Sequence, residues 1–283
     1  MGAISALTAA VGTLRRNPII FVGVFFLSAI GSLTTIGQVW GGLIVLGVGL
    51  LALLVTPFVT GGVLGMAEEA TAGGTSLTTL LSEGSANYLT LLLASIIQLL
   101  IFALAGILWA IGLFVLVLGG GVALGGIGGG AGAGAALGIG VVIAAVLFLL
   151  VFFLPFYFIQ FYDVAIVVSD TGALGAFKRS FGFVRRHLLS ALGYTILAQV
   201  VNLLVLVPTF WLTYGAPLSL AEVQTAAQRM ARASTTETLV PLVAYSLVAG
   251  TLVSSLLVTY RVTYYTSLTS ERTNRTTVDT GVE

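Results

Sequence analysis

The chain has 283 residues, of which 58% are hydrophobic and only 7% are charged, and its formal net charge is +1. A soluble domain is about 45–50% apolar and about 25% charged, so this composition excludes a soluble globular protein and favours one embedded in a membrane. The absence of cysteine excludes disulfides, thiolate metal sites and cysteine nucleophiles.

The N-terminal residues 2–16 predict an amphipathic helix that ends in Arg15 and Arg16. Steps of three and four residues place its large apolar side chains on one face. These residues are Ile4, Leu7, Val11 and Leu14. We expect such a helix to lie in the membrane interface, with its apolar face toward the acyl chains and its arginines at the headgroups.

Six membrane-spanning helices are predicted from long runs without charge. No acidic or basic residue occurs at 17–67, 84–162, 188–221 or 238–260, and about 20 apolar residues suffice to cross a bilayer as a helix. The first run is too long for one span, so we expect a turn in the sequence TTIGQVWGG. The predicted spans are 18–36, 41–66, 89–118, 137–162, 188–213 and 239–266.

The connection between the third and fourth spans is rich in glycine. Residues 119–140 contain twelve glycines, which raises the question of a nucleotide-binding loop. A strict G-x-G-x-x-G does not occur there, and no strand is predicted before it. We therefore expect a flexible connection, in which small residues also allow close helix packing.

Residues 172–186 repeat the layout of residues 2–16 at a constant offset of 170, without a gap. The identical positions are Gly2 and Gly172, Ala3 and Ala173, Ala6 and Ala176, Gly12 and Gly182, Arg15 and Arg185, and Arg16 and Arg186. The apolar positions also coincide, with Leu174, Phe177, Phe181 and Val184 in the second copy. A weaker middle copy matches at an offset of 98, where Asn87-Tyr88 replaces the arginine pair.

We interpret the pattern as a threefold repeat, in which each unit is an interfacial helix followed by two spans. The units are about 1–66, 67–162 and 163–266. The alternative is that any loop on the inner face of a membrane protein gathers arginines.

The predicted fold is thus an all-α polytopic membrane bundle in one membrane domain, residues 1–266, with a polar cytoplasmic tail, residues 267–283. Arg229 and Arg232 fall on one face of the membrane, and the other basic residues fall on or near the opposite face. These are Arg15, Arg16, Lys178, Arg179, Arg185, Arg186, Arg261, Arg272 and Arg275. Because basic residues favour the cytoplasmic side, we expect both termini in the cytoplasm and the bundle in the plasma membrane.

Two segments carry a family resemblance: ISALTAAVGTLRRNPIIF and DVAIVVSDTGALGAFKRSFGFVRRHLLSALGY. They resemble uncharacterised six-helix membrane proteins related to the membrane domain of glycerophosphoryl diester phosphodiesterases, across about residues 2–266. Ten arginines to one lysine and a threonine-rich tail suit a haloarchaeal member. The resemblance implies a multi-pass membrane location and no agreed activity. Members with phosphodiesterase activity carry it in a separate soluble domain, which we do not expect here.

No motif in the sequence predicts catalysis. His187 is the one histidine in the chain. We therefore expect neither a metal site built from several histidines nor a Ser-His pair of the usual kind. We therefore expect no enzyme, no metal, no cofactor and no nucleic-acid partner. Near the cytoplasmic ends of the spans, ionisable groups are costly unless paired, which predicts an ion pair of Arg261 with Asp163 or Glu68.

Two functions remain open, with a membrane enzyme ranked third. The first is a membrane-organising or accessory protein that engages anionic lipid through basic side chains. Those side chains are Arg15, Arg16, Lys178, Arg179, Arg185 and Arg186. The second is a permease or channel for a small solute, with a path lined by Gln98, Gln160, Gln199 and Asn202, although interhelical hydrogen bonding also accounts for these four. The first ranks ahead, because no charge is predicted at mid-depth of the membrane.

Overall fold

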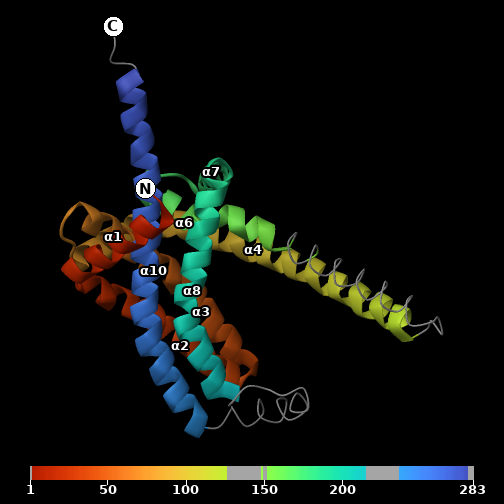
Figure 1. Ribbon diagram of the computed structural model, residues 1–283. Coiled ribbons are helices and arrows are strands. Elements are labelled where there is room, and N and C mark those ends of the chain that lie inside the picture. The colour runs from red at the N-terminus through yellow and green to blue at the C-terminus, as the bar shows by residue number, and fades with distance from the viewer. Residues whose placement is uncertain (1, 126–147, 149–151, 215–235, 280–283) are drawn as a thin grey trace.

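The structure is a computed structural model that describes residues 2–125, 148, 152–214 and 236–279. Its regular elements, within these ranges, are all helices, which confirms the all-α fold class (Figure 1). They are α1 (Ala3–Arg16), α2 (Ile19–Trp40), α3 (Gly42–Ala72), α4 (Leu77–Gly125), α6 (Tyr162–Ser169), α7 (Ala173–Arg186), α8 (Leu188–Tyr214) and α10 (Thr236–Asp279). Residues 152–159 form a further helical segment just before α6.

Six stretches of helix are long and apolar enough to cross a membrane, which confirms the predicted number. They are Ile19–Gly37, Gly42–Ala72, Leu77–Gly112, Phe152–Ser169, Leu188–Trp211 and Val240–Thr269. The turn between the first two falls at Gly41 and Gly42, within the predicted segment. Both residues have left-handed backbone angles, with φ of 67° and 58°, which glycine adopts without steric cost.

Helices α1 and α7 lie toward the same end of the bundle, and the C-terminal part of α10 extends beyond that end (Figure 1). We call it the α1–α7 end. Helix α1 packs on α10 and α8, while α7 packs mainly on α6. The first and last described helices therefore meet at one end, as an even number of spans requires.

The buried core that joins α6, α7, α8 and α10 is aromatic. Its rings are Phe161, Phe183, Tyr194, Tyr260, Tyr264 and Tyr265, each at most 4% exposed. Phe161 lies at the centre, with its ring centroid 5.0 Å from that of Tyr194 and 5.2 Å from that of Phe183. Aromatic pairs at this spacing add to the stability given by burial alone, so this cluster fixes how the four helices meet.

Glycines bring α3 and α4 into backbone contact. A Cβ added at Gly62 would lie 2.2 Å from the carbonyl oxygen of Leu80, and one added at Gly84 would lie 2.7 Å from that of Phe58. Small residues allow such close approach between membrane helices, where packing replaces the hydrophobic effect as the driving force. This contact anchors the beginning of α4 to the bundle.

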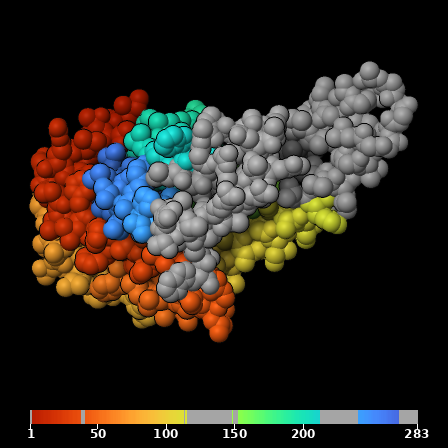
Figure 2. Space-filling view, turned by 90° about the horizontal axis from the view of Figure 1, so that it is seen from below, coloured from red at the N-terminus to blue at the C-terminus, as the bar shows by residue number. Residues whose placement is uncertain are grey.

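The middle unit differs from the prediction, because α4 is one continuous helix of 49 residues. The expected interfacial helix does not end at Asn87-Tyr88. In the first copy Pro18 forces Asn17 out of helical geometry, with φ of −125° and ψ of 66°, whereas no residue at 87–90 breaks the middle helix. Its C-terminal part extends away from α1, α2 and α10 (yellow in Figure 2), while Phe102 and Trp109 contact Phe156 and Phe152 of the segment before α6.

Two helices extend beyond their predicted spans. Helix α10 continues to Asp279, so the predicted polar tail from residue 267 begins as helix, in a segment without glycine or proline. Helix α4 reaches Gly125, inside the predicted glycine-rich connection. The rest of that connection, the start of the predicted fourth span, Arg229 and Arg232 lie outside the described residues.

The glycine contact predicts that Gly62→Ala destabilises the protein. The added methyl group meets backbone, which cannot move aside as a side chain can, so we expect a cost of about 1–3 kcal/mol and a lower Tm in detergent. Gly49→Ala is the control on the same helix, because its Cβ would have no atom within 4 Å. Equal melting temperatures for the two variants would contradict the contact.

Candidate functional site

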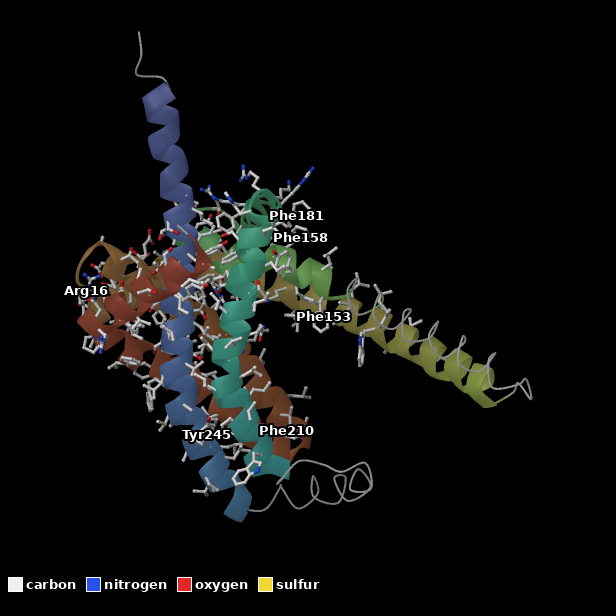
Figure 3. The ribbon with its side chains drawn as sticks, in the orientation of Figure 1. Arg16, Phe153, Phe158, Phe181, Phe210 and Tyr245 are labelled. Atoms are coloured by element: carbon white, nitrogen blue, oxygen red, sulfur yellow. The ribbon has the colours of Figure 1, made fainter. Side chains whose placement is uncertain are left out.

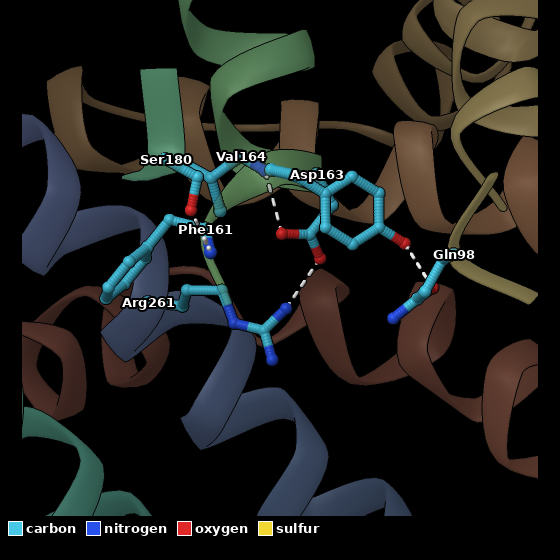
Figure 4. Close-up of polar contacts among 7 residues, drawn as sticks. Gln98, Phe161, Asp163, Val164, Ser180 and Arg261 are labelled. Carbon is cyan, nitrogen blue, oxygen red and sulfur yellow. Dashed lines mark hydrogen bonds and ion pairs between the residues drawn. The ribbon is translucent and has the colours of Figure 1, made fainter. Parts of the chain in front are cut away.

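An ion pair lies inside the bundle between Asp163, in the first turn of α6, and Arg261 on α10 (Figure 4). Arg261 Nη1 donates to Asp163 Oδ2 at 2.5 Å, and the backbone N–H of Val164 donates to Asp163 Oδ1 at 2.9 Å. The Asp163 side chain is 11% exposed, whereas that of Arg261 is 34% exposed. The guanidinium is therefore the more accessible partner, and the pair satisfies two charges that would be costly alone.

Glu68 was the other predicted partner of Arg261. It lies half-buried on α3 and forms no ion pair within the described part of the chain. Of the two predicted partners, the structure brings only Asp163 to the guanidinium.

The position of Asp163 depends on a break in the helix at residues 160–161, just before α6. The backbone N–H of Phe161 donates to Ser180 Oγ at 3.1 Å, and the Ser180 hydroxyl donates to the carbonyl oxygen of Phe158 at 2.9 Å. Unsatisfied backbone groups cost several kcal/mol in lipid, so a break requires such substitutes. Ser180, from α7, thus holds the start of α6 and the carboxylate that follows it (Figure 4).

A cavity of about 520 Å³ lies among α2, α3 and α10, with Asp163 and Arg261 at one end. It follows α10 from Ser246 to Arg261, which is about 22 Å at the rise of an α-helix. Seven hydroxyl side chains line it: Ser28, Ser32, Thr35, Thr56, Thr60, Ser246 and Ser254. The cavity thus combines a mainly apolar lining surface with a set of hydroxyls and one ion pair, among membrane-spanning helices.

The hydroxyls divide into two groups. Ser32, Thr35 and Ser246 donate to carbonyl oxygens of their own helices at 2.9, 3.2 and 3.1 Å, so toward the cavity they offer oxygen lone pairs as acceptors. The others form no hydrogen bond with any described residue, and they retain a donor. These are Ser28, Thr56, Thr60 and Ser254.

The four predicted pathway residues lie elsewhere. Gln98 Oε1 accepts a hydrogen bond from the Tyr162 hydroxyl at 2.6 Å, and Gln160 Oε1 accepts one from the Thr195 hydroxyl at 3.1 Å. Gln199 and Asn202 are exposed on α8. None of the four lines the cavity, and the two half-buried amides, Gln98 and Gln160, serve as interhelical hydrogen-bond partners.

The sequence contained one signal for the cavity. Its hydroxyl and glycine positions recur at a spacing of four on each helix, as in Ser28 and Ser32, Thr56 and Thr60, and Ser246, Gly250 and Ser254. That spacing defines one face of a helix. However, serine and threonine at this spacing also occur at dry helix contacts, as in the buried ladder Thr251, Ser255 and Thr259 of α10.

The six predicted lipid-binding side chains are all exposed. Arg179 Nε donates to the Tyr265 hydroxyl at 3.0 Å. The other five, Arg15, Arg16, Lys178, Arg185 and Arg186, form no ion pair with any residue that the structure describes. Near α7, side chains that end in nitrogen atoms project away from the bundle (Figure 3).

Helices α1 and α7 correspond position by position. Each has 14 residues and an extended glycine N-cap, and their ends differ by 170 residues. Their buried positions also match at this offset: Ala6, Ala10, Thr13 and Leu14 in α1, and Ala176, Ser180, Phe183 and Val184 in α7. The predicted apolar face divides between the two sides: Ile4 and Leu174 are 72% and 68% exposed, whereas Leu14 and Val184 are buried against the protein.

These features define a multi-pass α-helical membrane protein with an ion pair and a hydroxyl-bearing cavity inside its bundle. Among the described residues, no three histidine, aspartate or glutamate side chains gather to hold a metal ion. The chain belongs to the family described as Domain of unknown function (DUF7847), whose model matches residues 1–268. Comparison with curated proteins and with solved structures gave no match.

The ion pair predicts that Arg261→Gln lowers the Tm and the folded yield in detergent, because it leaves Asp163 without its cation. A fully buried pair loses about 3–5 kcal/mol when one partner is removed. We expect less here, since the guanidinium is partly accessible.

The double variant Arg261→Met with Asp163→Leu should recover much of this loss, because no charge remains unpaired. Arg186→Gln, at an exposed arginine without an ion pair, is the matched control and should melt like the wild type. A wild-type Tm for Arg261→Gln would show that the pair does not stabilise the fold.

Proposed function

We propose that this protein is a membrane-organising or accessory protein that engages anionic lipid at its α1–α7 end and catalyses no reaction. The observation that carries the proposal is the set of five exposed basic side chains without an ion pair, on two helices at that end. A Lys or Arg near an anionic membrane surface contributes about 1 kcal/mol of attraction.

Exposed apolar side chains beside these cations support a position at the membrane surface. Ile4 and Val11 are exposed on α1, and Leu174 and Phe181 are exposed at the corresponding positions of α7. A helix that exposes both large apolar and basic side chains suits the boundary between headgroups and acyl chains.

A purely structural explanation accounts for only part of the basic set. Arg15, Arg16, Arg185 and Arg186 lie in the last turns of their helices, where a cation interacts favourably with the helix dipole. Lys178, by contrast, lies in the middle of α7, where the dipole has little effect. Attraction to lipid accounts for all five residues.

The proposal includes an internal repeat of α1 and α7, each followed by two spans. The matching lengths, caps and buried positions of the two helices support it. We propose no separate interfacial helix for the middle unit, since α4 is continuous. The proposal also includes a relationship of these segments to the membrane domain of glycerophosphoryl diester phosphodiesterases, in which catalysis would belong to a separate soluble domain.

The lipid proposal predicts that replacing Arg15 and Arg16 with alanine weakens binding of anionic lipid by about 30-fold, and that replacing Arg185 and Arg186 has a similar effect. The measurement is native mass spectrometry of phosphatidylglycerol retained by the full chain in mild detergent. The matched control replaces the same arginines with lysine, which keeps the charge and should retain most of the lipid. Equal retention by the alanine and lysine variants would contradict the proposal.

The proposed orientation places both termini and the α1–α7 end in the cytoplasm of a cell whose plasma membrane holds the bundle. Nine of the eleven basic residues support it through the positive-inside rule. Since the chain has no cysteine, single introduced cysteines give labelling without background.

The orientation predicts that a membrane-impermeant maleimide, added outside intact cells, labels Leu43→Cys but not Lys178→Cys. Leu43 is 84% exposed and follows the turn at Gly41 and Gly42, at the other end of α2 from α1. Permeabilised cells provide the control, in which both cysteines should react. Strong labelling of Lys178→Cys from outside would reverse the orientation.

A second candidate function is a permease or channel for a small solute. The observation that favours it is the hydroxyl-lined cavity, whose polar side chains lie among membrane-spanning helices. Hydroxyls between membrane helices commonly form hydrogen bonds within the protein, but four of those in the cavity form none with a described residue. Its lining replaces the predicted set of Gln98, Gln160, Gln199 and Asn202.

A further inference from the structure

We infer that the cavity among α2, α3 and α10 is a binding site for a small, uncharged polyol. This inference deepens the second candidate function by naming its site and its class of solute. At about 520 Å³, the cavity falls within the range of about 300–1,000 Å³ that is usual for small-molecule sites.

The charge of the cavity excludes an ion as the preferred ligand. Asp163 and Arg261 are the charged residues of its lining, and they neutralise each other. A ligand with a net charge would leave that charge uncompensated among membrane-spanning helices, where it is costly. A neutral ligand leaves the ion pair intact.

The hydroxyls of the cavity favour a ligand that both donates and accepts hydrogen bonds. Ser28 on α2, Thr56 and Thr60 on α3, and Ser254 on α10 have no hydrogen-bond partner among the described residues. All four residues are half-buried, so their hydroxyls are accessible from the cavity and open to hydrogen bonds with water or a ligand. Ser32 and Ser246 offer acceptors on the same walls. A chain of hydroxyl groups, each a donor and an acceptor, matches both kinds.

The composition of the walls favours an open-chain ligand. Gly31 and Gly250 lie in the lining, where the absence of a side chain widens the cavity, and a Cβ added at Gly31 would have no atom within 4 Å. The described lining contains no aromatic ring on which a sugar ring or a base could stack. An open-chain polyol therefore fits this site better than a cyclic sugar or an aromatic solute.

The test uses the full chain reconstituted in liposomes and ribitol as the probe. Stopped-flow light scattering measures ribitol entry down an imposed gradient, with empty liposomes as the baseline and succinate as a charged comparison. Wild-type vesicles should take up ribitol well above the baseline and should not take up succinate. The double variant Thr56→Val with Thr60→Val should lower the ribitol rate about tenfold, as expected for the loss of two hydrogen bonds.

The matched control is Thr90→Val, the same substitution on α4 at a residue outside the cavity, which should leave the rate unchanged. A ribitol rate that Thr56→Val with Thr60→Val does not lower would overturn the site. Uptake of succinate in preference to ribitol would overturn the class of ligand.

A second readout separates binding from transport. Ribitol should raise the Tm of the wild type and of Thr90→Val in detergent, but not that of Thr56→Val with Thr60→Val, since a ligand stabilises only the protein that binds it. A shift in Tm without ribitol entry would uphold the site while rejecting the permease. Neither a shift nor entry would overturn the inference and leave the lipid proposal untouched.

Discussion

One serine hydroxyl controls how the centre of this bundle is built. A helix that breaks among membrane spans leaves backbone groups that no water can satisfy, and Ser180 satisfies both the N–H of Phe161 and the carbonyl of Phe158. Since α6 begins directly after this break, the same contact sets the direction in which Asp163 meets Arg261. The amphipathic helix at the bundle end and the ion pair that borders the cavity are therefore parts of one arrangement.

Much of the fold could be predicted, because long charge-free runs have few uses other than crossing a membrane. The number of spans and the glycine turn between the first two follow from that pattern. The prediction was wrong where one residue decides whether a helix stops. Asn17 is followed by proline, while the corresponding Leu89 is followed by Thr90, and α4, packed on α3, continues as helix through these residues.

The site was harder to predict, since a polar residue at membrane depth has several uses that the sequence does not separate. Amides were the obvious candidates, yet Gln98 and Gln160 satisfy hydrogen bonds between helices. The hydroxyls line the cavity instead. A serine or threonine hydroxyl can also donate to a carbonyl oxygen of its own helix, and then it is accommodated in a membrane much as an apolar side chain is. Which face of α10 borders a cavity depends on its neighbours α2 and α3. The pairing of Asp163 with Arg261 could be predicted as one of two alternatives, because few ionisable groups lie near the spans.

The length of α4 couples the shape of this protein to the membrane around it. Its apolar stretch, Leu77–Gly112, has 36 residues and measures about 54 Å, against a hydrocarbon core of about 30 Å. A helix with such an excess is accommodated by tilting or by local thickening of the bilayer, and α4 already leaves the bundle obliquely to α8 and α10 (Figure 1). Because the contact at Gly62 of α3 holds the beginning of this helix, a thicker membrane requires α4 to lie closer to the membrane normal. The angle between α4 and the bundle thus depends on the lipids in which the protein resides.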